Sequence, residues 1–306
     1  MFTVSFSIFL IFSHFFHTGF IDLENKFFSQ DFDEDKKIII LLGSSHVGQL
    51  NTTHIEEYIT KKNPEYKIYN LAYGADTPER RLESLDKLIS LKPTLVLYGI
   101  SYRDLSIPIM NNNLFPDPKL YFHDFASSFG TNLEINNPKL ITLEYIRNAQ
   151  NNSILFVPTE RITFPNTPFF VYYAPSQMSI VNETELGKRA FTSEAASINI
   201  VEPSINRQTI SLIKLVNGLE RNGAKVVLFT APLHKFYLEE LTNSQNETFN
   251  KTLEKISNES QVKIYNLTEK YSDLPIWINV GHIAFNKNSL IYSDDISKII
   301  EEEIER

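Results

Sequence analysis

A short apolar run, Ile38–Leu42, is the feature that most constrains what this chain can fold into. It has the length of a buried strand, stops at Gly43, and is followed by two serines and the start of a helix-like segment. Open α/β sheets bind ligands outside the carboxyl ends of parallel strands. Helix N-termini stabilise negative charge. Ser45 is therefore the first candidate for a nucleophile.

Strand and helix patterns alternate over much of the rest of the chain. Further strands are expected at residues 66–71, 94–98, 225–229 and 262–265. Helices are expected at residues 49–62, 77–91, 206–222, 236–257 and 289–303. Such alternation predicts right-handed crossovers and a parallel sheet covered on both faces. The predicted fold class is α/β, a three-layer α/β/α sandwich of flavodoxin-like type with a mostly parallel sheet of about five strands.

Composition excludes several classes of function. The net charge is −8 without basic clusters, which argues against a nucleic-acid partner. The absence of cysteine rules out disulfides, thiolate metal sites and cysteine nucleophiles. The seven histidines are scattered without the spacing of metal ligands. We therefore expect neither a metal nor an organic cofactor.

The first twenty residues carry no charge and are dominated by apolar side chains. Residues 1–20 are expected to be a signal peptide or a membrane anchor, with a buried N-terminal helix as the alternative. Residues 21–35 are expected to form an acidic linker, and residues 36–306 the folded domain. Glycosylation triplets point to an extracellular or cell-surface location and start at Asn51, Asn151, Asn182, Asn246, Asn250, Asn258 and Asn266.

The alternation of strand and helix patterns stops between residues 105 and 203, which are rich in Asn, Pro and aromatic residues. A long irregular insertion inside a compact domain is usually a lid, a binding segment or a small subdomain. An insertion without a direct role in function is the equally weighted alternative.

Four loops are expected to meet at one edge of the sheet. They contain Gly43–Ser45, Ala72–Asp76, Gly99–Asp104 and Asn279–His282. A nucleophile, backbone donors and a base that arrive from separate loops form a serine-hydrolase constellation.

On these residues the chain resembles the SGNH/GDSL hydrolase superfamily. The resemblance covers residues 36–105 and 206–306, and it is strongest to the cell-surface branch of polysaccharide O-acyl esterases and acyltransferases. In that family a Gly-Asp-Ser sequence after the first strand supplies the nucleophile. Here it reads Gly43-Ser44-Ser45. The resemblance therefore implies that Ser45 is the nucleophile and that Ser44 replaces the aspartate.

The later sequence blocks of the family are also present, with two substitutions. The resemblance implies that the N–H groups of Ser45 and Gly74 form the oxyanion hole. Ser101 occupies the position of the oxyanion asparagine. His282 matches the catalytic base, and Asn279 occupies the position of the aspartate that orients it. An asparagine cannot stabilise an imidazolium as a carboxylate does, and Asp→Asn in a serine protease costs about 10⁴ in kcat.

Several alternatives stay open at this stage. Three acids could substitute for the missing aspartate, and spacing does not choose among Asp76, Asp104 and Asp273. Ser44 and Ser45 could simply cap a helix. His46 is expected to point away from the serine, because adjacent side chains diverge. His234 is expected to stabilise a turn or to contact the substrate.

The function implied by the resemblance is that of a serine esterase or O-acyltransferase. Its partner would be an acylated cell-surface carbohydrate or another small ester. One alternative is a catalytically inactive protein of the same fold that binds envelope glycans. Another is an unrelated flavodoxin-like binding domain, in which Ser45 and His282 would lie more than about 8 Å apart, beyond hydrogen-bond reach.

Overall fold

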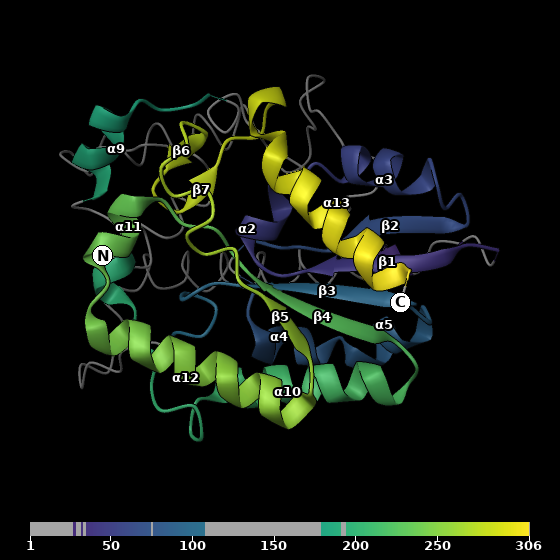
Figure 1. The fold of residues 1–306 in the computed structure, drawn as a ribbon. Coiled ribbons are helices and arrows are strands. Elements are labelled where there is room, and N and C mark those ends of the chain that lie inside the picture. The colour runs from purple at the N-terminus through teal and green to yellow at the C-terminus, as the bar shows by residue number, and fades with distance from the viewer. Residues whose placement is uncertain are drawn as a thin grey trace, which may run out of the picture.

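The computed structural model describes residues 27–28, 32, 35–74, 76–107, 179–190 and 194–305. A five-stranded sheet with the strand order β2-β1-β3-β4-β5 lies at its centre, and every pair of neighbouring strands is parallel. The strands are β1 (Lys37–Leu42), β2 (Tyr66–Asn70), β3 (Leu95–Ile100), β4 (Lys225–Thr230) and β5 (Lys263–Tyr265). Helices cover both faces of the sheet (Figure 1). The predicted fold class is confirmed.

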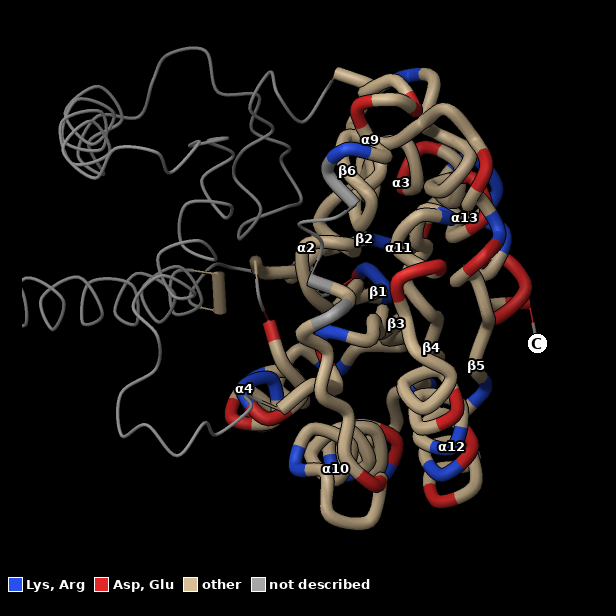
Figure 2. Tube along the Cα trace, turned by 90° about the vertical axis from the view of Figure 1, so that its left-hand side faces the viewer, with Lys and Arg blue, Asp and Glu red and all other residues tan. Residues whose placement is uncertain are grey.

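The helices form two layers. One face is covered by α4 (Pro78–Glu83), α5 (Leu85–Ser90), α10 (Arg207–Arg221) and α12 (Asn243–Ser260). The other face is covered by α3 (Thr52–Thr60) and α13 (Leu290–Ile304). Acidic and basic residues are interspersed along α12, whereas α10 carries Arg207, Lys214 and Arg221 with a single acid, Glu220 (Figure 2).

The apolar side chains of β1 pack on both faces of the sheet. Ile38, Ile40 and Leu42 belong to the core under α10. Ile39 and Leu41 belong to the core under α13. A strand reads as a continuous apolar run when helices cover both of its faces, which explains the pattern in β1.

Three expected helices differ from the observed ones. The helix expected at 49–62 is shorter, with α3 beginning at Thr52, because the Asn51 side chain accepts from the His54 N–H and caps it. A separate single turn, α2 (Ser45–Gly48), precedes it. The helix expected at 77–91 is divided at Ser84 into α4 and α5. The helix expected at 236–257 is divided into α11 (Lys235–Glu240) and α12, because Thr242 forms a capping box that starts a new helix.

The chain connections of this strand order reverse direction between β1 and β3, and sheets of this order bind ligands outside the strand ends at that point. Two glycines let the loops approach each other. Gly43 has a φ of +137°, and a Cβ there would lie 2.7 Å from the carbonyl oxygen of Gly99. The loops that carry Ser45 and Ser101 therefore lie side by side.

The N-terminal region is described only in part. The signal peptide or anchor expected at residues 1–20 lies outside the described residues. Within the expected linker at 21–35, Phe27 is buried and packs on Tyr69 with ring centroids 5.5 Å apart. Part of this stretch therefore contributes to the core. In the part of the chain that the structure describes, no helix is long and apolar enough to cross a membrane.

The ends of the expected insertion are also described, although residues 108–178 are not. The Ile107 N–H donates to the carbonyl oxygen of Asn199 at 2.9 Å. The two described ends of the insertion therefore lie side by side. Its returning part contains α9 (Glu183–Ala190) and a short 3-10 helix, η1 (Glu194–Ser197).

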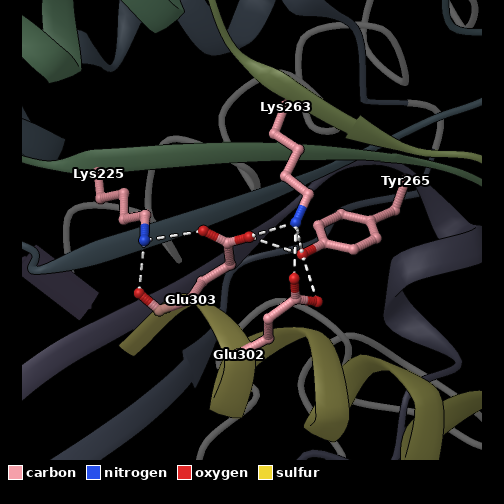
Figure 3. A network of polar contacts seen from close by, with 5 residues as sticks. All are labelled: Lys225, Lys263, Tyr265, Glu302 and Glu303. Carbon is pink, nitrogen blue, oxygen red and sulfur yellow. Dashed lines mark hydrogen bonds and ion pairs between the residues drawn. The ribbon is translucent and has the colours of Figure 1, made fainter. Parts of the chain in front are cut away.

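A polar network fixes the C-terminal end of α13 to the sheet (Figure 3). Lys225 and Lys263 lie 2.8 Å and 3.0 Å from the carboxylate oxygens of Glu303, and the Tyr265 hydroxyl donates to the same carboxylate at 2.6 Å. Although burial opposes ionisation, these donors lower the pKa of Glu303 to about 2.

We expect Glu303→Gln to reduce the free energy of unfolding at pH 7 by about 1–2 kcal/mol, because charge-assisted hydrogen bonds are lost. The pKa of the Glu303 carboxyl is lower in the folded protein than in the unfolded chain, so its ionised form stabilises the fold at pH values above the usual carboxyl pKa. That contribution is lost as the pH falls towards about 2. Urea unfolding at pH 7 and pH 3 measures the difference between variant and wild type. A difference that does not shrink at the lower pH would contradict this account of the network.

Candidate active site

Ser45 and His282 meet at the carboxyl edge of the sheet. Ser45 is the first residue of α2, directly after the turn that follows β1. His282 begins β7 (His282–Ile283), which pairs with β6 (Trp277–Asn279) in a small antiparallel sheet. The Ser45 Oγ lies 2.8 Å from the His282 Nε2. This contact contradicts the hypothesis of an unrelated binding domain, which required the two groups to be far apart.

Sequence patterns did not reveal this small sheet, because its two strands are shorter than any periodicity can show. Its turn is nevertheless what presents the base. The Asn279 Oδ1 accepts a hydrogen bond from the Gly281 N–H at 2.9 Å and lies 3.0 Å from the His282 Nδ1.

The Asn279 contacts determine the tautomer of His282. A backbone N–H can only donate, so the oxygen of the Asn279 amide, and not its nitrogen, must face Gly281. The same oxygen faces the His282 Nδ1, which must then carry the hydrogen. The His282 Nε2 is left as the acceptor for the Ser45 hydroxyl. Asn279 thus supplies the tautomer that an aspartate would impose, but not its negative charge.

The His282 ring is neutral at neutral pH. Burial, followed by the positive charge of Arg103, lowers the pKa of His282 to about 4. A neutral ring can accept the serine proton, although a low pKa makes it a weak base. We therefore expect esterase activity to fall as pH drops through about 4, where the ring becomes protonated.

Two of the three expected oxyanion donors are available. The N–H groups of Ser45 and Gly74 make no hydrogen bond with the described residues. The Gly74 loop is held beside the end of β1, because the Tyr73 N–H donates to the carbonyl oxygen of Gly43 at 3.1 Å. A Cβ at Gly74 would meet nothing within 4 Å, so there is open space beside this loop.

The third expected donor, Ser101, is engaged elsewhere. Both its N–H and its hydroxyl donate to the Asp104 carboxylate, at 2.7 Å and 2.9 Å. A hydroxyl has one hydrogen to donate, so Ser101 cannot serve an oxyanion while it keeps this bond. Its role in the oxyanion hole stays a prediction.

None of the three candidate acids hydrogen-bonds to His282. Asp76 forms a fully buried ion pair with Arg81. Asp273 lies 3.3 Å from Lys235 at the surface. Asp104 accepts from Ser101, and burial raises the pKa of its carboxyl to about 6. Among the described residues, Asn279 is therefore the one polar side chain on the far ring nitrogen of His282.

The two other histidines considered in the sequence differ in their roles. His234 caps α11, because its Nδ1 accepts from the Phe236 N–H at 3.1 Å, which confirms the expected turn-stabilising role. His46 was expected to point away from the serine, but its ring stacks on the ring of His282. The prediction missed this because side-chain divergence along a strand does not hold in the turn α2.

In the described residues, no group of three His, Asp or Glu side chains could hold a metal ion.

The sequence matches no described protein family and no curated protein. Solved structures with a distantly similar fold include an acetyl xylan esterase, with 11% identity, a TM-score of 0.44 and coverage of 86% of this chain and 99% of the other. The esterase EstA from Pseudoalteromonas sp. has 11% identity, a TM-score of 0.43 and coverage of 89% and 100%. An extracellular lipase from Streptomyces rimosus has 11% identity, a TM-score of 0.42 and coverage of 86% and 99%.

Proposed function

We propose that this protein is an SGNH-type serine esterase or O-acyltransferase that acts on an acylated cell-surface polysaccharide or glycan. The observation that carries the proposal is the 2.8 Å contact between the Ser45 Oγ and the His282 Nε2. It joins a nucleophile and a base that lie on separate loops at the sheet edge where such folds bind ligands.

The reaction follows from this geometry. The Ser45 Oγ attacks the acyl carbonyl while the His282 Nε2 accepts the hydroxyl proton. The N–H groups of Ser45 and Gly74 donate to the developing oxyanion. His282 then returns the proton to the departing alcohol and leaves an acyl-serine. Attack by water on that intermediate gives hydrolysis, and attack by a sugar hydroxyl gives transfer.

The experiment that tests the substrate class offers an acetylated polysaccharide to the purified protein and measures released acetate. Added unacylated glycan then competes with water for the acyl group. Acetate release that falls while acylated acceptor accumulates identifies a transferase, whereas unchanged release identifies an esterase. Turnover of short synthetic esters without any turnover of acylated glycans would refute the glycan part of the proposal.

Because Asn279 carries no negative charge, we expect a carboxylate at this position to increase the rate of ester hydrolysis. We expect Asn279→Asp to raise kcat/KM for a short ester by about 10- to 100-fold, because a carboxylate stabilises the imidazolium formed during attack. The gain is smaller than the roughly 10⁴ known from serine proteases, since the tautomer is already correct here. The acidic limb of the pH profile should move to higher pH as the pKa of His282 rises.

The matched control is Asn288→Asp, which adds the same charge at an exposed position in the 3-10 helix η2 (Lys287–Ser289). It should leave both kcat/KM and the pH profile unchanged. Loss of activity in Asn279→Asp would mean that the amide is required for a different reason, and would contradict the role given to Asn279.

A second candidate function is glycan binding without turnover. It is favoured by one observation, the commitment of Ser101 to Asp104 in place of a third oxyanion donor. This function predicts calorimetrically measurable binding of an acylated glycan together with no release of its acyl group.

A further inference from the structure

His46 is a buried histidine that the catalytic steps above do not use. It follows Ser45 directly in α2, and its ring lies against that of His282. The ring centroids are 4.8 Å apart and the planes differ by 7°, so the two rings are stacked nearly in parallel. One face of the His282 ring is therefore covered by another aromatic ring.

The ring of His46 is itself held in place. Its Nδ1 lies 3.2 Å from the Oγ of Ser44, within hydrogen-bond distance. Ser44 is the N-cap residue of α2. The His46 ring is therefore held by Ser44 and packs against the ring of His282.

These contacts hold the turn that carries the base from two sides. Asn279 fixes the turn from within, through the Gly281 N–H and the His282 Nδ1. His46 packs against the turn through its ring, which is stacked on that of His282. Ser44, which stands where the related family has an aspartate, holds the His46 ring through its Nδ1.

We propose that His46 is a positioning residue for the base: the hydrogen-bonded chain of Ser44 and His46, whose ring stacks on that of His282, holds the His282 ring in the orientation that aims its Nε2 at Ser45. The inference deepens the proposed function and rests on it. It explains how an imidazole without a carboxylate partner keeps a reactive geometry. A misplacement of about 1 Å at such a group can cost about 10²-fold in rate.

His46 can fill this role only as a neutral ring, since a second positive charge would oppose protonation of His282 during attack. The charged groups around it are Arg103 and Asp104. Burial lowers the pKa of His46 well below its usual value, with further lowering by His282 and Arg103, which keeps the ring neutral.

The test compares His46→Ala with His46→Phe, which keeps a stacked ring but loses the hydrogen bonds. We expect His46→Ala to lower kcat for a short ester by roughly 10- to 100-fold with KM changed less than about twofold. His46→Phe should recover part of the lost kcat. The control His54→Ala removes a histidine of α3 that hydrogen-bonds with Asp294 outside the site, and it should leave kcat unchanged.

A second measurement does not depend on turnover. The ring of His282 is titrated by NMR in ¹³C-histidine-labelled protein, with the signal assigned by its absence in His282→Gln. We expect its pKa to rise in His46→Ala, because the ring becomes more exposed and loses a neighbouring ring. An unchanged kcat and an unchanged titration in both His46 variants would overturn the inference.

The kinetic measurement and the NMR titration together separate this inference from the proposed function. If the wild-type protein turns over no ester, the proposed function fails while the titration still tests His46. If the wild type is active and His46→Ala does not fold, His46→Phe carries the kinetic arm alone. Wild-type kcat and titration in that variant would overturn the contribution of the hydrogen-bonded chain.

Discussion

Ser45→Ala is expected to abolish hydrolysis of short acyl esters, with a fall in kcat of roughly 10⁴- to 10⁶-fold, the range seen when a serine hydrolase loses its nucleophile. The Ser45 Oγ has no substitute within the site. Ser44 is directed to His46, and the Ser101 hydroxyl is committed to Asp104. Steady-state kinetics with a chromogenic ester measures the effect.

The control for this variant is Ser90→Ala at the exposed end of α5, where the hydroxyl donates only to the Lys87 carbonyl oxygen. It should hydrolyse esters at the wild-type rate. Equal activity of Ser45→Ala and wild type would remove Ser45 from the mechanism and, with it, the proposed function.

The largest expected effect on stability is that of Asp76→Ala. Asp76 and Arg81 form an ion pair in which both side chains are fully buried, and Arg81 also donates to the Leu71 carbonyl oxygen at 3.0 Å. Removing the carboxylate leaves a buried guanidinium without its counter-charge, which costs about 3–5 kcal/mol. We expect the free energy of unfolding, measured in urea, to fall by that amount.

Arg81 also joins the two ends of the loop that carries Gly74, because it contacts Leu71 before that glycine and Asp76 after it. The variant should therefore also lose ester hydrolysis. The control is Glu185→Ala, which breaks the exposed ion pair with Lys188. Exposed pairs contribute about 0–1 kcal/mol. A loss below 1 kcal/mol in Asp76→Ala would show that the buried pair is not needed for stability.

Much of the fold could be predicted from local patterns. The apolar runs of β1 and β3 predict strands buried on both faces, and their alternation with helices predicts a parallel sheet in a three-layer sandwich. The strand order β2-β1-β3-β4-β5 comes from the structure alone. Helix boundaries were less predictable. Thr242 and Ser84 interrupt apolar periodicities that continue across them, so single helices were expected where two exist.

The site could be predicted in its principal residues but not in its supporting contacts. The sequence pairs Ser45 with His282 through family resemblance, and the structure brings the two together. The sequence gives no sign that the Gly281 N–H orients the Asn279 amide, because that depends on the fold of the two-residue turn between Asn279 and His282. The stacking of His46 on His282 likewise depends on how far α2 turns after Ser45.

The central claim is that Ser45 is a nucleophile activated by His282, although no carboxylate contacts that histidine in the described residues. The most direct measurement is labelling of the wild-type protein with a fluorophosphonate, followed by mass spectrometry of the peptide that carries the label. We predict a single modification on Ser45, absent after substitution of His282 by Gln and increased in rate in Asn279→Asp. A wild-type protein that stays unlabelled, or a label on another serine, would contradict the account.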